Sequence, residues 1–213
     1  MTSIYLLRHG ESEMNLRLAE IVSGRSNHTP LTKKGYAQAR AAGEWLAKHG
    51  IVPDITITSP ALRTRETLAT ALGAMQHIST PEVEDRIQEI SHGAMEGQPR
   101  LEVWNDERKK LHAEQPLHYA LPGGESIVDV QMRKMEWLED VVKRYPGQTI
   151  LAAGHGYAIR SIVGHLLGWE HDQIAYMSET PNCSLTHITY ENGIFGVEYL
   201  GRDIVTEQLA ETK

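Results

Sequence analysis

Short apolar runs and longer amphipathic stretches alternate along the chain. Three apolar runs rich in β-prone side chains predict buried strands, at residues 3–7, 55–58 and 149–153. Three amphipathic stretches predict helices, at about residues 33–48, 126–145 and 157–167. This alternation predicts an α/β fold with a doubly wound, mostly parallel sheet covered by helices on both faces, which is a three-layer α/β/α sandwich.

Capping signals predict where two of the helices begin. Thr32 precedes the first helix and is a favoured N-cap residue. Ser59 offers a second cap and Pro60 the first helical position, which places Arg63 in the first turn of that helix. A cation is mildly disfavoured at the positive end of a helix, so the sequence favours a bound anion near Arg63.

The middle of the chain has weaker patterning. A short strand is expected at residues 77–80, whereas residues 92–124 lack strand alternation and hold several charges and prolines. We expect a single domain over residues 1–213 with a cap-like insertion at about 92–124. After it, Ser126 and Asp129 form a capping pair that predicts the start of the next long helix.

The C-terminal part of the chain predicts a hairpin. Asn192 and Gly193 are a strong turn signal, and they separate β-rich runs at residues 184–190 and 194–200. These two strands are expected to be antiparallel at the end of the sheet. The last dozen residues are polar, and we expect them to be loosely ordered.

Composition narrows the class of protein. The net charge of -7 disfavours non-specific binding to nucleic acid, since phosphate backbones are held by clustered cations. No apolar run approaches the roughly 18 residues that span a bilayer, and the N-terminus lacks signal-peptide features. A lone cysteine, Cys183, suits a reducing compartment, so we expect a cytoplasmic protein that binds no membrane. The eleven histidines show no metal-ligand spacing.

Reactive side chains follow two of the predicted strands. Arg8, His9 and Gly10 come directly after the first apolar run, and His155 and Gly156 come after the run at 149–153. In open α/β sheets, ligands bind at the carboxyl ends of parallel strands. The two histidines are therefore expected to meet at one end of the sheet.

Five segments carry a family resemblance. They read R-H-G-E-S at residues 8–12, S-P-A-L-R-T-R-E-T at 59–67, E-I-S-H-G-A-M-E-G at 89–97, P-G-G-E-S at 122–126 and G-H-G at 154–156. In this order, and with Asn15, they resemble the histidine phosphatase superfamily, also called the phosphoglycerate mutase-like family. The resemblance covers nearly the whole chain. It implies that the histidine at the position of His9 becomes a phosphohistidine.

The residues themselves suit phosphoryl transfer. His9 can attack phosphorus only through an unprotonated nitrogen, and flanking cations such as Arg8 and Arg63 disfavour its protonated form. Arginine also binds two phosphoryl oxygens at once through its planar fork. The resemblance implies that Arg8, Arg63 and His155 hold these oxygens, with Asn15 as a neutral donor.

Several residues are expected beside this catalytic set. Ser23, Gly24 and Gly156 are the candidate substrate-binding positions, the first two through their resemblance to the family's substrate-side loop.

We expect a carboxyl group to be the proton donor for the leaving alcohol. Glu89, Glu96 and Glu125 compete for this role on chemistry alone. The resemblance selects Glu89, the first glutamate of the family's E-x-x-x-G-x-x-E-G stretch. The sequence departs from many phosphatase members at Met95, where they carry tryptophan, and this change affects the expected pocket wall.

Phosphatases and mutases share such a site and differ in what accepts the phosphoryl group. The family's mutases carry a long basic insertion, whereas the corresponding stretch here is short, although it holds Arg100, Arg108, Lys109 and Lys110. We therefore expect a phosphatase that hydrolyses small-molecule phosphate esters with no metal and no cofactor. A phosphoglycerate mutase-type phosphotransferase is the alternative, and a non-catalytic module that binds a phospho-ligand is a third hypothesis. A homodimer is compatible with the sequence.

Overall fold

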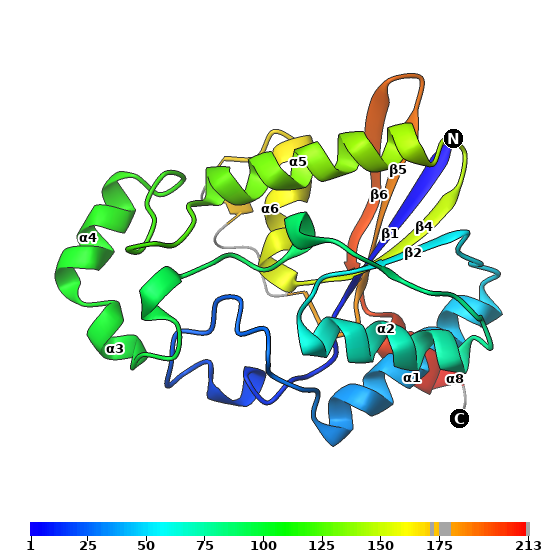
Figure 1. The fold of residues 1–213 in the computed structure, drawn as a ribbon, viewed down its shortest axis with the longest axis horizontal. Helices are drawn as coiled ribbons and strands as arrows, with labels where there is room; N and C mark the ends of the chain where they lie inside the picture. Colours follow the sequence, from blue (N-terminus) through cyan, green and yellow to red (C-terminus); the bar gives the residue numbers. More distant parts are fainter. Residues whose placement is uncertain (171–172, 175–179, 212–213) are drawn as a thin grey trace.

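A mixed sheet lies at the centre of the computed structural model, which describes residues 1–170, 173–174 and 180–211 (Figure 1). Within these residues, its strands are β1 (Thr2–Arg8), β2 (Ile55–Thr58), β3 (Glu82–Val83), β4 (Thr149–Gly154), β5 (Leu185–Glu191) and β6 (Ile194–Arg202). Their order is β3-β2-β4-β1-β5-β6. The pairs β3–β2, β2–β4 and β4–β1 are parallel, while β1–β5 and β5–β6 are antiparallel. The expected fold class is confirmed.

Helices cover both faces of the sheet (Figure 1). One face carries α1 (Lys33–Lys48), α2 (Leu62–Ala74) and α8 (Ile204–Glu211), and the other carries α5 (Ile127–Arg144) and α6 (Gly156–Leu166). Short 3-10 helices are η1 (Asn15–Arg17), η2 (Asp85–Ile87) and η3 (Gly93–Met95).

Two apolar clusters join these layers. Trp45 and Leu68 lie in the cluster between the sheet and α1, α2 and α8, and Trp137 and Ile159 lie in the cluster beneath α5 and α6. All four side chains are at most 2% exposed. Burial of each side chain of this kind contributes about 1.5–3 kcal/mol, so both faces hold the sheet rigidly.

Residues 92–124, which we call the cap, add no strand to the sheet. They contain η3, α3 (Arg100–Val103) and α4 (Asp106–Glu114), which lie beyond the carboxyl ends of the parallel strands (Figure 1). The cap is tied to the loop after β1 by a bridge between Ile21 and Pro99.

The sheet register brings the two predicted histidines together. Arg8, the last residue of β1, pairs with Gly154, the last residue of β4. The next residue, His9, donates its backbone N–H to the Gly154 carbonyl at 3.0 Å. His9 and His155 therefore leave neighbouring strands at the same level.

Three of the predicted boundary signals are confirmed. The Thr32 hydroxyl accepts from the N–H of Gly35 at 3.0 Å. Ser126 and Asp129 form a reciprocal capping box. The hairpin turn between β5 and β6 has Asn192 and Gly193 in the left-handed backbone region that this tight turn requires.

The start of α2 differs from the prediction. Its N-cap is Ala61, without a side-chain cap, and Pro60 lies before the helix. The Ser59 hydroxyl instead bonds His155, 96 residues away, at 2.8 Å. Arg63 still lies in the first turn of α2.

The prediction was also wrong at two other segments. Residues 77–80 form no strand, and β3 follows at Glu82–Val83 as a short edge strand with two paired positions. The C-terminal residues are not loosely ordered up to residue 211, because α8 packs against α1 with Ile204 fully buried. In the part of the chain that the structure describes, no helix has the length and apolar character to cross a membrane.

Candidate active site

A cavity of about 650 Å³ opens at the carboxyl ends of the parallel strands. Eight of the predicted site residues line it: Arg8, His9, Asn15, Ser23, Gly24, Arg63, Glu89 and Gly156. The ninth, His155, is fully buried behind the wall. The cavity is of the size that holds a small organic ligand.

His9 is held in one orientation and one charge state. Its Nδ1 donates to the Gly10 carbonyl at 2.7 Å, which assigns the ring proton to Nδ1 and leaves Nε2 with a lone pair. Burial, and then the charges of Arg63 and Arg8, lower the pKa of His9 well below its usual value. His9 is therefore a neutral imidazole beside two cations, as a nucleophile toward phosphorus requires.

Arg63 and His155 form a buried pair behind His9. Arg63 Nη2 donates to His155 Nδ1 at 3.0 Å, so the proton of His155 is on Nε2, which donates to the Ser59 hydroxyl at 2.8 Å. The rings of His9 and His155 lie 5.4 Å apart. His155 is thus joined to the other predicted catalytic residues by its hydrogen bond with Arg63 and by its ring contact with His9.

The rest of the Arg63 guanidinium is fixed by the loop after β1. Its Nη1 donates to the carbonyls of Arg25 and Ser26, each at 2.9 Å. Burial lowers the pKa of Arg63 to about 10, which leaves the side chain charged at neutral pH. Arg63 lines the cavity and is already held in place before the reaction begins. No free energy is then needed to reorient it when charge develops on a ligand, and such preorganised groups stabilise developing charge most effectively.

Arg8 precedes His9 at the end of β1 and lines the same cavity. Its Nη1 donates to the carbonyl of Thr180, and its side chain is buried. Gly156 leaves room for it, because a Cβ at this position would lie 2.9 Å from Arg8 Nε. Gly156 therefore acts on the site by allowing the close approach of an arginine.

Glu89 lies at the N-terminus of α6. Its Oε1 accepts from the N–H groups of Ile90 and Ala158, each at 3.0 Å, and its Oε2 accepts from Tyr157 at 3.2 Å. A helix N-terminus favours a carboxylate. The carboxyl group is therefore fixed at the wall of the same cavity as His9.

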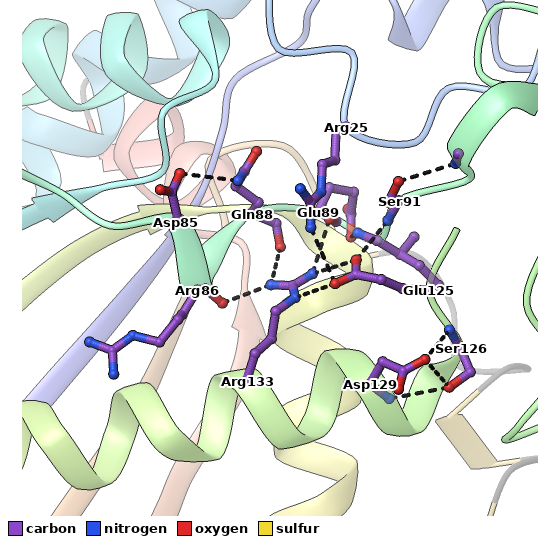
Figure 2. Close-up of polar contacts among 12 residues, drawn as sticks. Arg25, Asp85, Arg86, Gln88, Glu89, Ser91, Glu125, Ser126, Asp129 and Arg133 are labelled. Atoms are coloured by element: carbon purple, nitrogen blue, oxygen red, sulfur yellow. Dashed lines mark hydrogen bonds and ion pairs between the residues drawn. The ribbon is translucent and has the colours of Figure 1, made fainter. Parts of the chain in front are cut away.

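Glu125 and Arg133 hold the segment that carries Glu89 (Figure 2). Arg133 Nε donates to Glu125 Oε1 at 2.8 Å, and its Nη1 and Nη2 donate to the carbonyls of Arg86, Gln88 and Glu89 at 2.7–3.0 Å. Burial alone would raise the pKa of Glu125, but the bonds from Arg133 and a backbone N–H outweigh it and lower this pKa. Glu125 is an anchor for the segment.

Glu96 anchors the substrate-side loop. Its Oε1 accepts from the N–H groups of Arg25 and His92 at 3.0 Å, and its Oε2 accepts from Ser26 at 3.2 Å. Gly24 has a φ of +54°, and a Cβ there would lie 2.2 Å from Glu96 Oε1. Of the three glutamates that competed for the acid role, Glu89 is the one whose carboxylate accepts hydrogen bonds from backbone N–H groups alone, and it lines the cavity.

Asn15 and Ser23 lie on the loop between β1 and α1. The Asn15 amide oxygen accepts from the N–H and hydroxyl of Ser12 at 2.9 and 3.1 Å, so its NH₂ group is the part that can donate to a ligand. Ser23 accepts a bond from Ser26 through its carbonyl, which shapes the turn at this wall.

Some residues of the site were missed by sequence reasoning. Ser59 and Thr180 hold His155 and Arg8, and Arg133 holds the Glu89 segment. These contacts join residues from distant parts of the chain, and no local pattern marks them. Trp104, Tyr119 and Arg160 also line the cavity. Among the described residues, no group of three or more potential ligands could hold a metal ion.

Comparison with known proteins connects this site to a family. A family model described as the histidine phosphatase superfamily (branch 1) matches residues 4–203. The chain belongs to this superfamily. The resemblance seen in the five sequence segments is therefore confirmed, and the site lies on the fold of a branch 1 histidine phosphatase.

Individual relatives of this superfamily member carry two kinds of name. A "2,3-bisphosphoglycerate-dependent phosphoglycerate mutase" from Nocardia farcinica is 31% identical over 89% of this chain and 87% of its own length. Among solved structures, YhfR of Bacillus stearothermophilus is 26% identical with a TM-score of 0.83, covering 96% of this chain and 100% of its own. A phosphoserine phosphatase of Entamoeba histolytica is 24% identical with a TM-score of 0.81, covering 95% and 98%, and shows the shared fold.

Proposed function

We propose that this protein is a phosphomonoesterase that works through a phosphohistidine at His9. The observation that supports it most directly is the bond from Nδ1 to the Gly10 carbonyl, since it leaves Nε2 unprotonated in a cavity that Arg8 and Arg63 also line. Burial and both arginines lower the pKa of His9, which keeps the nucleophile neutral.

In the first step, His9 Nε2 attacks phosphorus and the P–O bond to the alcohol breaks. Arg8, Arg63 and the Asn15 amide donate to the phosphoryl oxygens, where charge develops. Glu89, whose carboxyl group lines the same cavity, gives its proton to the departing alkoxide. His155, which the resemblance placed among the groups that hold the phosphoryl oxygens, is fully buried with both ring nitrogens bonded to Arg63 and Ser59, so it acts here as a positioning residue that orients Arg63.

In the second step, water attacks the phosphorus and the P–N bond breaks. Glu89 takes the proton of the water, and His9 regains its lone pair. The products are inorganic phosphate and the enzyme in its original protonation state. Side chains supply every proton and charge in this scheme, so it requires no metal or cofactor.

The position of the cap cations favours hydrolysis over mutase chemistry. Arg108 donates to the Val103 carbonyl at 3.0 Å, Lys109 lies 3.7 Å from Asp106 and Lys110 lies 3.9 Å from Glu114. None of these three cations lines the cavity. Of the basic residues of the cap, Arg100 lines it. A mutase must hold the carboxylate of its acid substrate, and this stretch offers little for that task.

The mutase names of several relatives at about 30% identity make phosphoglycerate isomerisation the second candidate. It shares the phosphohistidine and differs in returning the phosphoryl group to a second hydroxyl. The two candidates are distinguished by assay.

The test is release of phosphate from glycerol 2-phosphate in the presence of a chelator. We expect steady release by the wild type and none by His9→Ala, with His118→Ala, an exposed histidine on the cap, as the matched control. Turnover by His9→Ala at the wild-type rate would contradict the mechanism. Rapid isomerisation of 3-phosphoglycerate that depends on a 2,3-bisphosphoglycerate primer would replace the hydrolase with the mutase.

A further inference from the structure

Four ring side chains gather on the cap side of the cavity. His92, Trp104, His112 and Tyr119 all line it. The ring of Trp104 lies 6.5 Å from His92, 5.6 Å from His112 and 6.2 Å from Tyr119, and His112 and Tyr119 are 5.8 Å apart. Three of these four contacts are edge-to-face, an arrangement that aromatic pairs prefer.

This group is not simply the interior of the cap. The apolar cluster beneath the cap consists of the buried cap residues Val103 and Leu121 with Val22 from the loop after β1, and Trp104 and Tyr119 pack at its border while remaining partly exposed. His112 lies on α4, a helix that buries none of its residues. The rings therefore form a wall between the cap's small core and the cavity.

The cavity is far larger than a phosphate group needs. Its volume of about 650 Å³ lies within the range of sites that enclose ligands of drug size. Met14 and Leu18, on the loop after β1, and Tyr157, at the start of α6, add apolar surface to the same cavity. The space beyond the phosphate end thus suits a bulky group that carries apolar as well as polar surface.

We propose that the alcohol released by this enzyme carries a planar aromatic ring, which binds against Trp104, His112 and Tyr119. The inference rests on the proposed function and specifies its substrate class. A flat ring suits this wall because contacts between aromatic rings stabilise binding by more than the burial of apolar area alone. His92, which also lines the cavity, can exchange hydrogen bonds with heteroatoms on such a ring.

The first test compares substrates that differ only in the ring. Benzyl phosphate is paired with cyclohexylmethyl phosphate, and adenosine 5′-monophosphate with ribose 5-phosphate, so that the leaving oxygen is a primary alcohol in every case. We expect kcat/KM to be about 10-fold higher for the aromatic member of each pair, mainly through a lower KM. Equal kcat/KM within both pairs would overturn the inference.

The second test asks whether the ring side chains of the cap cause the preference for aromatic substrates. Trp104→Leu is expected to reduce the aromatic preference about 10-fold, toward unity, while Leu101→Ala, at a fully solvated position of the same cap, is the control. Since Trp104 borders the cap's core, His112→Leu on α4 provides an independent variant that should lower the preference in the same direction. A preference unchanged in both variants would contradict the proposal.

These assays separate the two proposals. If no ester in either pair releases phosphate in a reaction that depends on His9, the proposed function fails. If all four esters are hydrolysed with His9 dependence but without aromatic preference, the proposed function stands and the inference about the substrate class fails.

Discussion

The carboxyl ends of the strands and the cap line the same cavity but are built in opposite ways. At the strand ends, His9, Arg63 and His155 are at most 5% exposed, and most of their polar atoms are held by backbone carbonyls, by the Ser59 hydroxyl or by one another. In the cap, α4 buries no residue and its cations pair mainly with neighbouring residues of the cap. Rigid positioning of charge suits catalysis, whereas a less buried segment such as the cap suits contacts with the variable part of a ligand.

The largest expected effect comes from removing a cation at the strand ends. Arg63→Gln should lower kcat by at least about 100-fold, because a preorganised donor to the phosphoryl oxygens is lost. Arg65→Gln, an exposed arginine on the same helix, is the control. Steady-state kinetics with glycerol 2-phosphate provide the measurement, with circular dichroism to verify folding. A variant with near wild-type kcat would remove Arg63 from the mechanism.

The next effect depends on the leaving group. Glu89→Gln should slow hydrolysis of an alkyl ester about 100-fold, because a poor leaving alkoxide needs the proton. The loss should be much smaller for p-nitrophenyl phosphate, whose phenolate leaves unassisted. Glu102→Gln, on an exposed turn of the cap, controls for the change of charge. Equal losses with both esters would show that Glu89 is not the acid.

A smaller effect is expected on the titration of His9. Burial and the charges of Arg63 and Arg8 lower its pKa, so the ring should gain a proton only well below pH 6.5. Neutral His9 is the reactive form, and activity that depends on it should therefore persist into mildly acidic buffer. Arg8→Gln removes one of the opposing charges and should raise this pKa. Nuclear magnetic resonance of the labelled ring measures both values, and protonation of wild-type His9 at or above pH 6.5 would contradict the account.

The smallest effect should come from the cap's exposed cations. The double variant Lys109→Gln with Lys110→Gln is expected to change kcat/KM by less than about twofold, because solvated charges are screened. Both side chains are solvent-exposed and face acidic neighbours on α4. A large rise in KM for 3-phosphoglycerate alone would instead give these lysines the role that mutase chemistry requires.

Local rules predicted the elements that local interactions stabilise. The caps at Thr32 and Ser126 and the turn at Asn192 were correct because each is closed by atoms within three residues. Ser59 was misread since its hydroxyl bonds His155, far along the chain. The helix at the C-terminus was missed because burial of Ile204 against α1 outweighs the polar composition of the segment.

The same distinction between local and tertiary interactions applies to the candidate site. His9 and His155 could be brought together from sequence, because each directly follows a parallel strand that pairs with the other. The contact between His155 and Arg63 could not be predicted from the sequence, since it depends on the tertiary packing of α2. The ring side chains of the cap were also unpredictable, as residues 92–124 have no period that assigns their faces.

The central claim is that His9 carries the phosphoryl group during turnover. Rapid quench in alkali during hydrolysis of glycerol 2-phosphate, followed by mass spectrometry of the peptides, tests it directly. We expect a phosphoryl group on His9 that is lost on brief exposure to acid, as a phosphoramidate is, and that does not form in His9→Ala. A modification at another residue, or turnover with no phosphoenzyme at any time point, would contradict the account.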